Sequence, residues 1–263
     1  MPEYVGSDSS IALQKCLRTR QPMIENSPDL ANGARVLHCV EPAVTGWSRV
    51  KSFAEEDGLL GFPLVEEDSM KRDIEANFGS AWTLHVWHAL TGPAARVLQA
   101  CESVIESVPL PENWRLDLHD RPSGAEIAEI QALSAETGIA PYPAYYTRSE
   151  ALPVVTACLR DQTGNLVATA SVADRYHAEG RLSGHVFAGM VSVSDRCRGQ
   201  GLGKLINALA LVESQQRFGW QVATEQVAPD NAASLAMILA CGLDHADGLV
   251  SVAVSRSAEK FSR

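Results

Sequence analysis

Three glycines at alternate positions stand directly before an apolar helical run, in the segment RGQGLGK at residues 198–204. Glycines keep side chains off the backbone, so several N–H groups can converge on one anion. The N-terminus of the helix that follows adds the positive end of its dipole. With Arg196, Arg198 and Lys204 close by in the chain, the segment predicts a phosphate-binding loop.

Spacing excludes two common phosphate-binding motifs. A P-loop ends in Gly-Lys-Ser/Thr, whereas Gly203-Lys204 is followed here by Leu205, which cannot hold magnesium. A dinucleotide fingerprint runs G-x-G-x-x-G, whereas these glycines run G-x-G-x-G and Lys204 takes the place of the third glycine. The loop therefore belongs to a different kind of phosphate site.

The segment Arg198 to Gly203, preceded by a strand that ends Val191-Ser192-Val193, resembles the acetyl-coenzyme-A loop (Q/R-x-x-G-x-G/A) of the GCN5-related N-acetyltransferases, the GNAT family. A second element agrees with this resemblance. Asn231, Ser234 and Gly242-Leu243 fit the family pattern N-x-x-A/S-x-x-L-Y-x-x-x-G-F. The resemblance covers about residues 114–257.

The resemblance implies an α/β (α+β) fold with a mixed, mostly antiparallel twisted sheet flanked by helices, and acetyl-CoA as co-substrate with no metal. The amides of residues 199–204 would bind its pyrophosphate, and the backbone of Val191 and Val193 would pair with its pantetheine arm. Asn231 would contact the arm near the thiol, although a plain helix N-cap explains this residue equally well. The cofactor-binding residues expected are Val191, Val193, Arg198, Gly199, Gln200, Gly201, Leu202, Gly203, Lys204, Asn231 and Ser234.

The usual catalytic groups of the family are missing. Members often carry a Glu five residues before the equivalent of Asn231 and a Tyr seven after it, whereas this chain has Gln226 and Ile238. The candidates for general base are Glu225, which alternation places on the opposite strand face, and His185. We therefore expect catalysis by positioning, with proton loss through water.

A tyrosine is the alternative general acid. Tyr142, Tyr145 and Tyr146 lie in the segment that lines the acceptor pocket in family members, although aromatic packing explains each of them as well. Cys197, beside the loop, has no His or Asp at a spacing that supports covalent catalysis, so we expect it to pack in the core.

Two functions remain open. The first is an acetyl-CoA-dependent N-acetyltransferase that acts on a primary amine of a small molecule or peptide. The alternative is a non-catalytic acyl-CoA-binding or interaction protein, since a fold does not fix a function. A homodimer is compatible with both.

The elements that position these residues begin at Trp114 in the order strand, helices, three strands, helix, strand, helix, strand. Ser123 and Glu126 predict a capping box for the first of these helices. The proline-bearing stretch VPLPENW suggests a division into an N-terminal α/β domain at 1–110 and a GNAT-like domain at 114–263. The first segment would be a degenerate copy of the same fold or a cap.

Composition limits the partners. The net charge of −10 and pI near 5.2 argue against a nucleic-acid binder, which needs a basic face. No apolar stretch reaches a membrane-spanning length, and the first residues do not resemble a secretion signal, so the cytoplasm is expected. Six cysteines without a CxxC pair suit buried, reduced thiols better than a metal site. His85 and His88, three apart on an expected strand, fall on opposite faces.

Overall fold

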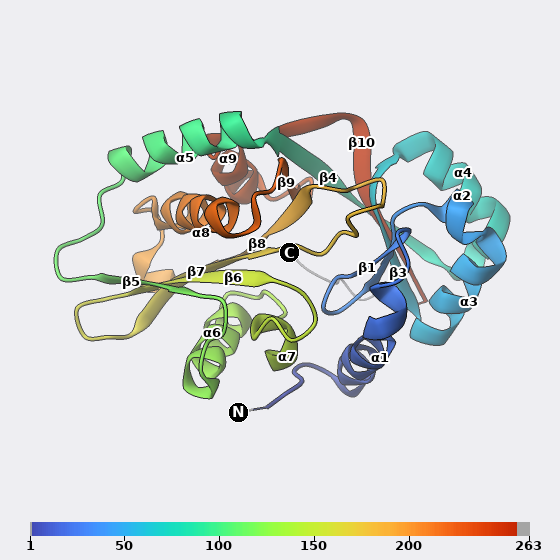
Figure 1. Ribbon diagram of the computed structural model, residues 1–263, viewed down its shortest axis with the longest axis horizontal. Helices are drawn as coiled ribbons and strands as arrows, with labels where there is room; N and C mark the ends of the chain where they lie inside the picture. The colour runs from blue at the N-terminus through green and yellow to red at the C-terminus, as the bar shows by residue number, and fades with distance from the viewer. Residues whose placement is uncertain (1, 257–263) are drawn as a thin grey trace.

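The computed structural model describes residues 2–256, which form one ten-stranded sheet with helices on both faces (Figure 1). The strands are β1 (Leu30–Asn32), β2 (Leu37–Cys39), β3 (Leu59–Glu66), β4 (Thr83–Pro93), β5 (Arg115–His119), β6 (Val154–Arg160), β7 (Leu166–Ala173), β8 (His185–Val193), β9 (Val222–Val227) and β10 (Asp244–Ser255). The α-helices are α1 (Asp8–Ile24), α2 (Pro42–Thr45), α3 (Trp47–Asp57), α4 (Glu67–Phe78), α5 (Ala94–Ser107), α6 (Gly124–Glu136), α7 (Ala144–Thr147), α8 (Leu202–Phe218) and α9 (Ala232–Ala240). Short 3-10 turns lie at Gly79–Ala81 and Asp195–Cys197.

The sheet is mixed and mostly antiparallel, which confirms the expected fold class. Its order is β1-β2-β3-β10-β4-β9-β8-β7-β6-β5, and only the pairs β2–β3 and β8–β9 are parallel. Helices α5, α8 and α9 lie over one face of the strands from β6 to β9, and α6 and α7 lie on the other (Figure 1). The element order after Trp114 is the one that the sequence predicts.

Strands from the two halves of the chain alternate in the middle of the sheet. β4, from the first half, lies between β9 and β10, which both come from the second. The helix after β4, α5, packs on α8, and its Val97, Cys101 and Val104 join the core of the second half. The division at 108–114 stays a prediction, but residues 1–110 contribute a strand and a helix to the layer that holds the glycine loop.

Local chemistry explains the elements around the site. Ser123 and Glu126 form the predicted capping box at the start of α6. Helix α8 begins directly after Gly201, which has φ +79°, and ends at Gly219, also in the left-handed region. Both ends are therefore fixed by glycines whose backbone conformation L side chains rarely adopt.

Strand β3 contains Gly61 and Pro63, two residue types that are unfavourable inside a strand. In the structure Val250 pairs with Val65 and Val252 with Phe62, so Pro63 falls in a β-bulge. A bulge leaves a residue without a ladder hydrogen bond, and proline has no N–H to lose there.

Among residues 2–256, no helix is both long and apolar enough to cross a membrane. Within the same range, no group of three or more His, Cys, Asp or Glu side chains is arranged to hold a metal ion. All six cysteines are free, and all except Cys16 are buried. His88 packs edge-on against the ring of His245, while His85 contacts Ser255.

Candidate functional site

A cavity of about 1280 Å³ joins the glycine loop to the middle of the sheet. It is bordered by residues of the glycine loop and of α9, by β4, β8 and β9, by the turn between β1 and β2 and by the segment before α7. One space therefore joins groups of different chemistry from both halves of the chain.

β8 and β9 separate to open this cavity. Their pairing is limited to His185 with Val222, Val186 with Ala223, and Phe187 with Thr224, although β8 continues to residue 193 and β9 to 227. The backbone of β8 beyond Phe187 therefore has no neighbour on its β9 side among the described strands. Such an open strand edge can pair with the amides of an extended ligand.

A bulge in β8 accompanies this separation. Thr169 of β7 pairs with Ser192 and Ser171 pairs with Gly189, so β8 carries an extra residue there. Met190 takes φ +56°, a left-handed value that a residue with a side chain rarely adopts. A bulge bends its strand and increases the local twist, which explains why β8 leaves β9 at this point.

The glycine loop has the backbone that an anion site needs. Gly199 and Gly201 have φ of +78° and +79°. A Cβ on Gly203 would lie 3.6 Å from Met237 Sδ and 3.8 Å from Val193 Cγ2, so this glycine faces the strand and helix that line the cavity. The bare amides at the start of α8 can therefore meet a phosphate without side chains in between.

The three cationic side chains near the loop have different environments. Arg196 forms an ion pair with Asp161 of the β6–β7 hairpin at 2.8 Å and does not border the cavity. Arg198 borders it and pairs with Asp195 at 2.9 Å. Lys204 borders it with no carboxylate partner in the described part of the chain. Lys204 and Arg198 are therefore the cations that can reach a bound phosphate.

The structure gathers most of the expected cofactor residues around one space. Those bordering the cavity are Val191, Val193, Arg198, Gly199, Gly201, Leu202, Gly203, Lys204, Asn231 and Ser234, while Gln200 is exposed and does not border it. The Asn231 side chain accepts from the Ser234 amide at 3.1 Å, as an N-cap does, and still borders the cavity. The structure confirms the N-cap, and the contact of Asn231 with the cofactor arm stays a prediction.

Glu225 borders the cavity, and its carboxyl is buried on the side of β9 that faces α8, as alternation predicts. Its side chain is 4% exposed and accepts a 2.8 Å hydrogen bond from Asn207 Nδ2. Burial raises the pKa of Glu225 to about 7, and the hydrogen bond from Asn207 opposes this only in part. Asn207 Oδ1 is buried without a partner, so a protonated Glu225 would supply its missing donor. Gln226, the next residue, points to the opposite face.

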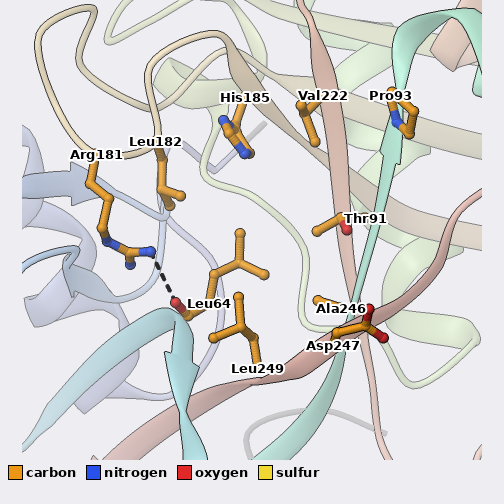
Figure 2. A pocket seen from close by; sticks show the side chains of 10 residues that line it. All are labelled: Leu64, Thr91, Pro93, Arg181, Leu182, His185, Val222, Ala246, Asp247 and Leu249. Carbon is orange, nitrogen blue, oxygen red and sulfur yellow. Dashed lines mark hydrogen bonds between the residues drawn. The ribbon is translucent and has the colours of Figure 1, made fainter.

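His185 lies outside the large cavity. It borders a separate pocket of about 440 Å³, where it faces Leu182 and Val222, and its Nδ1 is 3.1 Å from the Ser183 carbonyl (Figure 2). Nearby Arg181 donates to the Leu64 carbonyl at 3.0 Å, which ties this pocket to β3. The structure therefore does not bring His185 together with the glycine loop.

Of the three candidate tyrosines, two lie away from the large cavity and one borders it. Tyr145 and Tyr146 are buried, and their hydroxyls donate to the carbonyls of Gln14 and Asn32. Tyr142 alone of the three borders the cavity. Ile238, at the family's usual acid position, is 2% exposed and also borders it. Cys197 is buried in the core beside the loop, as expected.

Sequence reasoning missed a basic group at the other end of the cavity. Arg35, His38 and Arg175 border it there, together with Trp87 and Phe187. Arg35 and His38 come from the first half of the chain and Arg175 from the second. The only sequence signal is an arginine inside the apolar run ANGARVLHCV, which gives no hint of its partners in space.

Residues 124–243 match the model of the acetyltransferase (GNAT) family. Solved structures with the same fold include a GCN5-related N-acetyltransferase from Kribbella flavida, at 18% identity and TM-score 0.59, covering 92% of this chain and 95% of that one. A GCN5-related N-acetyltransferase-like protein from Streptococcus suis is 16% identical with TM-score 0.55, covering 88% and 84%. A tandem GNAT protein from the clavulanic acid biosynthesis pathway is 16% identical with TM-score 0.54, covering 87% and 78%. No curated protein matches the chain.

Proposed function

We propose that the chain, whose residues 124–243 match the acetyltransferase (GNAT) family, transfers an acetyl group from acetyl-CoA to a primary amine. The observation that carries this proposal is that the glycine loop and the unpaired part of β8 open onto one cavity. An extended ligand with a pyrophosphate at one end and amides along its length fits that arrangement.

The residues present suit acetyl-CoA at each step along the cavity. The amides of residues 199–203 and the N-terminus of α8 suit its phosphates, with Lys204 and Arg198 as counter-ions. The open edge of β8 at Val191 and Val193 suits the pantetheine amides. The thioester would then lie where β8 and β9 meet, near Phe187.

When bound, acetyl-CoA supplies a thioester whose carbonyl carbon forms a bond to the amine nitrogen while the C–S bond breaks and the thiol departs. Neither expected base is a free group beside Phe187, because the Glu225 carboxyl borders the cavity but is held by Asn207 of α8, and His185 lies in the other pocket. The chain therefore acts by holding two reactants in line, which accounts for about 7 to 11 kcal/mol of barrier in well-aligned systems. The amine proton leaves through water, and Tyr142, which borders the same cavity, is the candidate phenol for protonating the departing sulfur.

A non-catalytic acyl-CoA-binding protein is the second candidate. Ile238, buried at the family's usual acid position, is the observation that favours it. For either function we propose the cytoplasm as compartment, since six unpaired cysteines suit a reducing environment. We propose a small-molecule or peptide amine as partner, and no nucleic acid.

Calorimetry of acetyl-CoA followed by thiol release across a panel of primary amines tests the proposal. We expect micromolar-range binding and amine-dependent thiol release, with both lost in Gly201→Asp. Binding without thiol release from any amine would favour the non-catalytic alternative, and no binding at all would exclude both.

A further inference from the structure

Two arginines without a carboxylate partner border the large cavity at the end away from the glycine loop. We infer that the acetyl acceptor is an amine that also carries a carboxylate, and that Arg35 and Arg175 bind this carboxylate. The inference rests on the proposed function, because it names the acceptor class for the same site.

Arg175 is held rigidly in the cavity wall. The residue is 7% exposed, and its guanidinium lies 3.8 Å from the centre of the Phe187 ring. Nη2 donates to Tyr176 Oη at 2.9 Å, while Nε is buried with no hydrogen-bond partner. No carboxylate among residues 2–256 pairs with it. A guanidinium stays charged in a protein, so a bound anion can supply the charge partner that the described residues do not give Arg175.

Arg35 also has no carboxylate partner. It follows β1 in the turn to β2, and its Nε is buried without a partner. Within the described residues its side chain has neither an ion pair nor a hydrogen bond. Burial lowers the pKa of Arg35, and the group that opposes this through its charge is Tyr142, which is not a carboxylate. The site therefore tolerates a second uncompensated cation.

His38 and Tyr142 place the two arginines close to each other. The positive charge of Arg175, in addition to burial, lowers the pKa of His38 well below its usual value, so His38 is neutral. Both Arg35 and Arg175 act on the Tyr142 hydroxyl through their charges. His38 Nδ1 is buried without a partner. The cluster thus holds two cations, an imidazole and a phenol around one space.

Two other arginines whose side chains are mostly covered pair with carboxylates. Arg160 pairs with Asp117 at 3.1 Å and with Glu129 at 2.5 Å. Arg20 contacts Asp57 at 2.7 Å. The chain as a whole carries ten more negative than positive charges. Two unpaired guanidinium groups in an acidic protein are therefore a local feature of this cavity, not a consequence of composition.

The position of the pair separates it from the cofactor phosphates. Arg175 stacks on Phe187, which makes the last pairing contact between β8 and β9. The glycine loop begins beyond the far end of β8. With phosphates at the loop and the thioester at the strand junction, the arginines lie on the acceptor side of the thioester. A planar guanidinium fork matches a carboxylate in a bidentate pair, and two forks fix the orientation of the amine.

The experiment compares acceptors that differ only in this charge. Glycine and longer ω-amino acids are each assayed beside their own carboxamides, with acetyl-CoA as donor and thiol release as readout. A peptide with a free C-terminal carboxylate, beside its amidated form, separates peptide from free amino-acid acceptors. We expect kcat/KM for the best acid to exceed that of its amide by about 100-fold.

Arginine variants test which residues cause the preference. We expect Arg175→Gln and Arg35→Gln each to reduce the acid-to-amide ratio at least about tenfold, because the amide has no carboxylate to pair with either guanidinium. Arg121→Gln, an exposed arginine outside the cavity, is the matched control and should leave the ratio unchanged. Should Arg175→Gln fail to fold, Arg35→Gln carries the comparison alone.

The outcomes distinguish this inference from the proposed function. Acetyl transfer with a ratio near one, an unchanged ratio in both variants, or a preference for a phosphorylated amine would overturn the carboxylate site and leave the transferase intact. Absence of acetyl-CoA binding would overturn the proposed function. A second readout needs no turnover: an N-acetyl amino acid should raise the melting temperature of the wild type, and its amide should not. Absence of this difference also overturns the inference.

Discussion

Gly203→Asp should abolish tight acetyl-CoA binding without damaging the fold. Gly203 is the second residue of α8 and its φ is outside the left-handed region. The added Cβ would meet Met237 Sδ at 3.6 Å and Val193 Cγ2 at 3.8 Å, which are ordinary contacts. An aspartate in the first turn of a helix stabilises it by about 0.3 to 1 kcal/mol. The melting temperature should therefore be unchanged or slightly higher.

The same carboxylate would stand where we place the cofactor phosphates. Two unit charges about 5 Å apart repel by about 3 kcal/mol at an effective dielectric constant of about 20. This corresponds to about 200-fold weaker binding by calorimetry. Gly203→Asn has the same shape without the charge, so we expect it to lose less than about fivefold. Added salt should narrow the gap between the two variants because it screens the repulsion. Equal affinities for the Asp and Asn variants would refute a phosphate site at this helix.

Three further outcomes follow from the structure. The Glu225 carboxyl, with pKa about 7 when folded against 4.5 unfolded, stabilises the fold below pH 4.5 and loses that contribution as pH rises through about 7. The advantage of Glu225→Gln in unfolding free energy should therefore grow by about 2.5 kcal/mol between pH 5 and 8. A constant difference by urea titration would show that Glu225 is not buried as described. The dependence of kcat/KM on pH should be the same for Glu225→Gln, His185→Ala and the wild type. A decrease in kcat/KM of about 100-fold in either variant, with acetyl-CoA binding intact, would show that the residue is a dedicated base. Limited proteolysis should cut the exposed stretch 110–113. The two fragments should still co-elute on gel filtration, because β4 of the first fragment lies between β9 and β10 of the second. Separation of the fragments would contradict this strand order.

The sequence predicts the parts of the site that depend on local chemistry. The glycine loop, the start and end of α8 and the Asn231 cap are each set by a few adjacent residues, and all of them are present in the structure. The buried orientation of Glu225 also follows from strand alternation and is present. Glycine conformation, helix capping and strand alternation depend on residues close together in the chain, so they can be predicted from the sequence alone.

Contacts between residues far apart in the chain could not be predicted from the sequence. Nothing in the sequence of β4 indicates that it lies between β9 and β10, because strand order depends on contacts between distant segments. Arg35 and Arg175 are 140 positions apart, and only the folded chain brings them to one cavity. His185 was a candidate base and Tyr145 a candidate acid from their positions in the sequence. The fold places both outside the large cavity. Whether residues 1–110 are a degenerate copy of the second half stays a prediction.

Transfer of a labelled acetyl group is the most direct test of the function. Purified protein would be incubated with acetyl-CoA carrying a ¹³C-labelled acetyl group and an ω-amino acid, and the products would be analysed by mass spectrometry. We expect one labelled acetyl group on the amine nitrogen for each thiol released, and much less labelled product with Gly203→Asp at the same acetyl-CoA concentration. Tight acetyl-CoA binding with no labelled amine from any primary amine in the panel would contradict the proposal that this chain is an N-acetyltransferase.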